Sequence, residues 1–221
     1  MWFNYNKQMK KIIKEACIGS LNDAKKYLET DKINLIDRIE TCSDLDQGGL
    51  TPDLETFNYI KNKNIDQVVM IRRSRHFIIQ SQDELNQLIL DLNFYLDQGA
   101  KSFIFGYLND KNEIDIETCK ILINEIKKRN DSDLKWVFHM AIDEVDDYEK
   151  AFKTLIDLDF SRVLTKGGKD LAINNIEMIK KINNLYNDKI EIIIGGKVTS
   201  ENYLKICHQT NINQVHGTKI A

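Results

Sequence analysis

The fold class is most readily inferred from residues 67–107, QVVMIRRSRHFIIQSQDELNQLILDLNFYLDQGAKSFIFGY. This stretch begins with a short apolar run at 67–72 and ends with a second one at 102–107. Between them, over 83–96, apolar residues repeat on one face of a helix, at Leu85, Leu88, Ile89, Leu92 and Leu96. A strand, a helix and another strand in this order predict one β-α-β unit of a parallel sheet.

The same alternation continues along the chain in both directions. A second clear helix is predicted over 116–128, and Asp53 and Asp115 are typical helix N-caps. Eight strands are predicted, at 11–17, 36–42, 67–72, 102–107, 134–140, 162–165, 189–194 and 214–216. Eight such units with short connections predict an α/β fold, a single (β/α)8 TIM-type barrel. The alternative, an open doubly wound sheet, usually has a Gly-rich turn after its first strand, and here that turn contains only Gly19.

Composition indicates one ordinary globular domain. The 221 residues are 42% hydrophobic and 29% charged, enough to bury a core without disulfides or a structural metal. We expect an N-terminal extension at residues 1–10 and one barrel domain at 11–221. A net charge of −3 without a concentrated basic run argues against nucleic acid as a partner. No apolar stretch reaches the roughly 18 residues of a membrane span.

The four cysteines indicate a reducing compartment. They are far apart, and none forms a CxxC pair. The first residues also lack the uninterrupted apolar segment of a secretory signal. We therefore expect reduced thiols and a cytoplasmic location.

Two similar strand ends are the first candidates for a site, because barrel active sites lie at the C-terminal ends of the strands. The first predicted strand ends with Glu15 and Cys17, and the second ends with Glu40 and Cys42. Side chains alternate along a strand, and an unpaired carboxylate is disfavoured beneath the helices, so we expect all four to face inward. Neighbouring strands are about 4.8 Å apart, and soft thiolates this close select Cu(I) or zinc. Alternatively, Cys17 and Cys42 are small apolar packing residues.

Arginines follow the third predicted strand. Arg72, Arg73 and Arg75 suit an anionic group at the mouth, because guanidinium offers fixed bidentate donors. The alternative is that Arg72 pairs with Glu15 or Glu40 inside the barrel.

A histidine follows the fifth strand. His139, with Asp143 nearby, fits a general acid/base or a metal ligand, and equally a hydrogen-bonded structural histidine. His216 ends the last predicted strand.

Two glycine pairs follow late strands, and both are candidates for anion binding: Gly167, Gly168, Gly195 and Gly196. Paired glycines let backbone N–H groups approach an anion, as in the phosphate sites of barrel enzymes. The alternative is that they form tight turns that need positive φ.

Taken together, these segments resemble the CutC family of copper homeostasis proteins. The resemblance runs from residue 11 to about 217 and is carried by Glu15-Ala16-Cys17, Asp37-Arg38-Ile39-Glu40-Thr41-Cys42-Ser43, Gly48-Gly49-Leu50-Thr51-Pro52, Val69-Met70-Ile71-Arg72, Phe105-Gly106-Tyr107-Leu108, Glu113-Ile114-Asp115, His139-Met140-Ala141-Ile142-Asp143, Arg162-Val163-Leu164-Thr165-Lys166-Gly167-Gly168, Gly195-Gly196 and His216. It implies a single cytoplasmic (β/α)8 barrel that assembles as a homodimer or higher homo-oligomer. It also implies copper, as Cu(I), bound by Cys17 and Cys42.

The chain is expected to depart from the family pattern in three places, one of which is a C-terminus that stops earlier than usual. Where the family has Pro-Arg-Gly-Gly after Met-Ile-Arg, this sequence has Arg73-Ser74-Arg75-His76. The family's His-Arg-Ala-Phe-Asp appears with Met140 in place of arginine. These changes spare the cysteines and affect the predicted anion pocket.

Two functions are consistent with these residues. The first is a copper homeostasis protein whose partner is the metal ion. The second is a lyase- or isomerase-like enzyme that acts by acid/base chemistry on a small phosphorylated or carboxylated compound. Its candidate catalytic residues are Glu15, Glu40, Arg72, His139 and Asp143, with the Gly168 and Gly196 amides assisting Arg72 in holding the anion. Because a barrel fold does not by itself specify a function, a purely scaffolding role for the protein also stays open.

Overall fold

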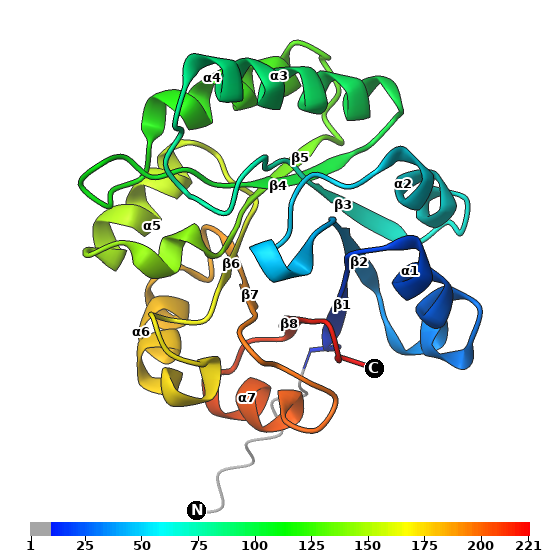
Figure 1. Cartoon of the computed structure of the whole chain (residues 1–221). Coiled ribbons are helices and arrows are strands. Elements are labelled where there is room, and N and C mark those ends of the chain that lie inside the picture. The colour runs from blue at the N-terminus through cyan, green and yellow to red at the C-terminus, as the bar shows by residue number, and fades with distance from the viewer. Residues whose placement is uncertain (1–9) are drawn as a thin grey trace, which may run out of the picture.

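The strands form a closed parallel barrel in the order β1 to β8 (Figure 1). The structure, a computed structural model, describes residues 10–221, so the extension predicted at residues 1–10 lies outside the described residues except for Lys10. The predicted (β/α)8 barrel is confirmed. The strands are β1 Ile13–Ile18, β2 Arg38–Thr41, β3 Asp66–Met70, β4 Ser102–Phe105, β5 Lys135–Phe138, β6 Arg162–Thr165, β7 Glu191–Ile194 and β8 Gln214–Gly217.

Helices surround the barrel, one after each strand from β1 to β7 (Figure 1). The α-helices are α1 Leu21–Leu28, α2 Leu54–Lys61, α3 Gln82–Asp97, α4 Ile116–Lys127, α5 Tyr148–Asp157, α6 Ile176–Tyr186 and α7 Tyr203–Thr210. Short 3-10 helices are η1 Asp31–Leu35, η2 Leu45–Gln47, η3 Met140–Glu144 and η4 Ala172–Asn174. No helix in the described part of the chain is long and apolar enough to cross a membrane.

Local sequence accounts for the helix starts. Asp53 and Asp115 cap α2 and α4 as predicted, each accepting a hydrogen bond from the backbone N–H three residues later. The helix predicted at 83–96 begins one residue earlier, because Ser81 is the cap and its Oγ accepts the N–H of Glu84 at 3.1 Å.

Several strands are shorter than predicted because apolar residues continue into the loops. The fifth strand ends at Phe138, although the predicted strand extends to Met140. His139 Nδ1 accepts the N–H of Ala141 at 3.1 Å, which turns the chain into η3 instead of extending the strand.

Alternation along the strands divides the core in two. The larger cluster lies between strands and helices. A smaller cluster fills the barrel interior and contains Cys17, Cys42, Val68, Met70, Ile104, Val137, Leu164 and Ile193. The first residues of the even strands add a buried polar layer of Arg38, Ser102, Arg162 and Gln214. Within the described residues the barrel interior is therefore packed at its base, and sites of such barrels lie at the mouth.

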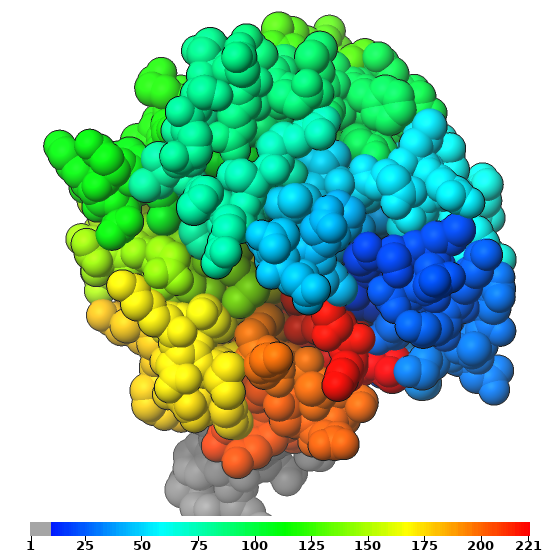
Figure 2. All heavy atoms as spheres, viewed as in Figure 1, coloured from blue at the N-terminus to red at the C-terminus, as the bar shows by residue number. Residues whose placement is uncertain are grey.

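The loop that carries η2 partly covers this mouth. In the view of Figure 1 it crosses in front of the strands, and in Figure 2 its residues form the surface near the middle of the molecule. The strand ends beneath it are consequently shielded from direct exposure to solvent.

Candidate functional site

Cys17 and Cys42 lie side by side inside the barrel. Their Sγ atoms are 3.8 Å apart, Cys17 is 9% exposed and Cys42 is fully buried. The strand register pairs Cys17 with Glu40, so Cys42 lies diagonally across from Cys17, two residues beyond that pair. The diagonal placement follows from the stagger between neighbouring barrel strands.

Glu15 is the centre of a buried charge cluster. Its carboxylate forms an ion pair with Arg38 and contacts His216 Nδ1 at 2.8 Å. Burial alone would raise the pKa of Glu15, but the Arg38 charge and the His216 hydrogen bond outweigh it and hold the pKa well below its ordinary value. Among the described residues Arg72 forms no ion pair with Glu15 or Glu40: Arg38 pairs with Glu15, and the Arg72 guanidinium donates to backbone carbonyls instead.

Stability at acidic pH is expected to depend on Glu15. Since its native pKa lies below the unfolded value of about 4.3, its stabilising contribution is fully present above that pH and is lost as the pH falls towards the native pKa. Urea unfolding between about pH 6 and pH 3 should show stability falling with pH, and less steeply for Glu15→Gln. Equal slopes in the two proteins would contradict this assignment.

Glu40 and His216 complete the group around Cys17. Cys17 Sγ donates to Glu40 Oε1 at 3.4 Å, and ligand atoms of Cys17, Glu40 and His216 all lie within 4.8 Å of one another. Desolvation is the main cause that raises the pKa of Glu40. Burial would lower the pKa of His216, but the Glu40 charge and hydrogen bonds to Cys17 and Glu15 raise it well above its ordinary value. The hydrogen bond to Cys42, followed by burial, raises the pKa of Cys17, so the metal-free thiol is protonated.

A cavity of about 380 Å³ opens above these side chains. Its walls combine soft, acidic and basic groups, and they are Cys17, Glu40, Asp46, Gln47, Gly48, Met70, Arg72, Arg75, Phe77, His139, Met140, Leu164 and His216. The cavity is larger than a single ion requires.

The arginines that follow β3 contact different parts of the protein. Arg72 donates from its terminal nitrogens to the carbonyls of Gly48 and Arg75, and its guanidinium lies 4.6 Å from the centroid of the Phe77 ring. It therefore holds the mouth loops while lining the cavity. Arg73 points elsewhere and forms an ion pair with Asp91 of α3.

His139 and Asp143 do not act as a pair. His139 is buried, and desolvation together with the Arg72 charge lowers its pKa well below the ordinary value, so the ring is neutral. Asp143 instead accepts hydrogen bonds from the hydroxyls of Tyr148 and Thr165, both at 2.6 Å. His139 lines the cavity, whereas Asp143 anchors the loop after β6.

Three of the four glycines in these pairs donate their N–H groups within the protein. Gly167 N–H donates to Thr165 Oγ1 at 2.9 Å, and Gly168 N–H donates to Asp143 at 3.2 Å. Gly195 N–H donates to the Thr165 carbonyl at 3.0 Å, and Gly196 has a φ of +80°. An external anion at the loop after β6 would have to displace the Asp143 carboxylate, and anion binding by the four glycines stays a prediction.

Sequence reasoning missed the roles of Arg38 and His216. Arg38 lies two residues before Glu40 and so shares its inward face, a signal that was available in the strand pattern. His216 meets Glu15 because β8 pairs with β1 and closes the barrel. That contact spans nearly the whole chain and has no local signal.

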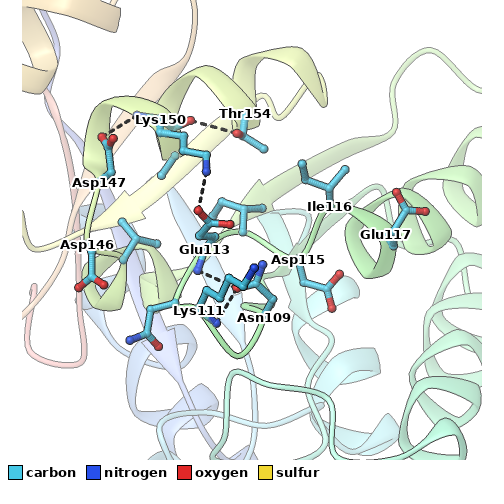
Figure 3. Close-up of a pocket in the computed structure, with 14 residues that line it drawn as sticks. Asn109, Lys111, Glu113, Asp115, Ile116, Glu117, Asp146, Asp147, Lys150 and Thr154 are labelled. Atoms are coloured by element: carbon cyan, nitrogen blue, oxygen red, sulfur yellow. Dashed lines mark hydrogen bonds and ion pairs between the residues drawn. The ribbon is translucent and has the colours of Figure 1, made fainter.

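A second pocket lies on the rim, between the loop after β4 and the start of α5 (Figure 3). Its polar groups hold the loops: Lys150 forms an ion pair with Glu113, Asp147 caps α5, and Asn109 accepts the N–H groups of Lys111 and Glu113. This pocket consequently offers no chemistry comparable to that at the mouth.

Comparison with known proteins shows which family the chain is similar to. The CutC family model matches residues 12–221. A Treponema denticola CutC family protein is 35% identical over 209 residues, covering 94% of this chain and 81% of that protein. A human protein named copper homeostasis protein cutC homolog is 32% identical over 203 residues, covering 91% of this chain and 71% of that protein. A crystal structure of a CutC protein from Streptococcus agalactiae has a TM-score of 0.85 at 34% identity and covers 95% of this chain and 100% of that one.

Proposed function

The chain belongs to the CutC family, and from this premise we propose that it is a copper homeostasis protein that binds Cu(I) through Cys17 and Cys42. The 3.8 Å separation of the two Sγ atoms carries the proposal, because one ion can contact both sulfurs at that spacing. Soft thiolate donors are the ligands that suit Cu(I), and both cysteines are buried.

The chain's own residues would prepare this site. The barrel wall buries both sulfurs, and the loop carrying η2 limits access of water and oxidants. Both thiols must lose their protons when metal binds, so binding releases protons.

Replacing both ligands is expected to abolish Cu(I) binding. An anaerobic Cu(I) titration of the reduced protein against a competing chelator should give one tight site, and Cys17→Ser combined with Cys42→Ser should remove it. Cys119→Ser combined with Cys207→Ser is the matched control, since both of these thiols are buried within helices. Undiminished binding in the Cys17/Cys42 double variant would overturn the proposal.

The same premise extends to assembly and location. We include a cytoplasmic homodimer or higher homo-oligomer in the proposal, supported by the family resemblance and by four cysteines that are all free.

A second candidate is a lyase- or isomerase-like enzyme, favoured by the size of the cavity and by the groups around it. Glu40 or His216 would move a proton, and Arg72 would hold an anionic group of a small phosphorylated or carboxylated compound. Electron density for phosphate or a small carboxylate beside Arg72 in soaked crystals would support it. Absence of such density in the cavity would count against the enzyme hypothesis.

A further inference from the structure

One oxygen of Glu40 is the unexplained group at the mouth. Glu40 is 2% exposed, and its Oε2 has no hydrogen-bond partner among residues 10–221. Its other oxygen meets only the weak donor Cys17 Sγ, at 3.4 Å. A buried carboxylate with an unpaired oxygen is costly unless a cation or proton joins it. Cu(I) bound to two thiolates does not require this carboxylate.

We propose that Cys17, Glu40 and His216 form a mixed sulfur, oxygen and nitrogen site for a divalent ion of the zinc class. The three ligand atoms lie within 4.8 Å of one another. A sulfur and a carboxylate oxygen bound to one tetrahedral zinc ion would be about 3.6 Å apart, from bond lengths of about 2.3 and 2.1 Å. The observed separation of Cys17 Sγ and Glu40 Oε1 is 3.4 Å, so this pair of ligand atoms needs little rearrangement.

Neighbouring residues orient the histidine for this role. His216 Nδ1 is bound to Glu15, which leaves Nε2 as the ligand atom, and Arg38 in turn holds Glu15. A carboxylate behind a metal-binding histidine fixes the ring and raises its basicity, and such partners are typical of zinc sites.

Charge and donor type distinguish this site from the Cu(I) pair. Binding would release the protons of the Cys17 thiol and of the His216 imidazolium to solvent. The resulting thiolate, carboxylate and neutral imidazole carry two negative charges, which balance a divalent ion. A hard carboxylate also suits zinc better than Cu(I). The inference shares Cys17 with the proposed function, but it needs Glu40 and His216 and does not need Cys42. Three protein ligands leave one coordination position for water or a small molecule from the cavity.

Cobalt(II), a spectroscopic substitute for zinc, tests the assignment on the reduced full chain under anaerobic conditions. Wild-type protein should show the visible bands of four-coordinate cobalt and a thiolate-to-cobalt charge-transfer band, and Zn²⁺ should remove both. Cys42→Ser should keep these bands, and the isosteric Glu40→Gln should lose them. Bands that survive in Glu40→Gln, or that disappear in Cys42→Ser, would overturn the three-ligand site.

X-ray absorption of zinc-loaded wild-type protein gives an independent answer if a variant fails to fold. One sulfur with nitrogen and oxygen neighbours is expected, and two sulfurs would overturn the assignment. Cu(I) titration of Glu40→Gln separates this inference from the proposed function, because that variant keeps both thiols. Cu(I) binding without the cobalt spectrum is expected there, and failure of Cu(I) binding in wild type would affect the copper proposal alone.

Discussion

Replacing Arg38 by Met is expected to lower the free energy of unfolding by about 3–5 kcal/mol. Arg38 is 4% exposed and Glu15 is 1% exposed, so the variant leaves a carboxylate buried without its main counter-charge. His216 still contacts Glu15, which places the expected loss nearer the lower limit. Gln214 also loses the donor to its side-chain oxygen.

Urea unfolding at neutral pH measures this loss. Lys101→Met is the matched control, because it removes a Lys–Asp pair whose lysine side chain is 58% exposed. Exposed pairs contribute at most about 1 kcal/mol. If both substitutions cost the same, the buried cluster around Glu15 does not stabilise the barrel as we infer.

Gly217→Ala is expected to cost about 3 kcal/mol through steric conflict at the end of β8. A Cβ atom at this position would lie 2.3 Å from the Val198 carbonyl oxygen. That oxygen belongs to the backbone after β7 and cannot rotate away, so the strand end must shift. The neighbouring His216 would move with it, and metal binding should weaken as well.

Gly99→Ala separates this conflict from the general cost of replacing glycine. Gly99 has a φ of +82°, and its added Cβ would meet only the flexible end of Lys61, 3.3 Å away. Backbone strain of about 1–2 kcal/mol is expected there. Thermal and urea unfolding of both variants make the comparison, and a Gly217→Ala protein as stable as Gly99→Ala would refute the steric argument.

The fold was predictable because its signals are local. Short apolar runs predicted eight strands, helical spacing of apolar residues predicted the clearest helices, and Asp53 and Asp115 predicted two helix starts. The predicted ends of the strands were less accurate where buried apolar or aromatic residues lie just beyond the strand and contact other parts of the barrel. Tyr107 shows this: it follows β4, and its hydroxyl donates to the Ile71 carbonyl at 3.0 Å.

The candidate site was predictable in part. Alternation grouped Glu15 with Cys17 and Glu40 with Cys42, and adjacency of consecutive strands brought the two pairs together. The partner of each charged group was not predictable. Arg72 and Arg38 were both available to Glu15, and the choice depends on their heights along the barrel axis.

The order of apolar and polar residues along the chain was enough to specify a parallel eight-stranded barrel and to place two thiols near its mouth. Barrel closure and stagger, which no short stretch encodes, brought His216 of β8 against Glu15 of β1. They also left one Glu40 oxygen without a hydrogen-bond partner in the part of the chain that the structure describes. The physical reason is range: hydrophobic periodicity acts between near neighbours, whereas buried charges select their partners after distant strands have been packed together.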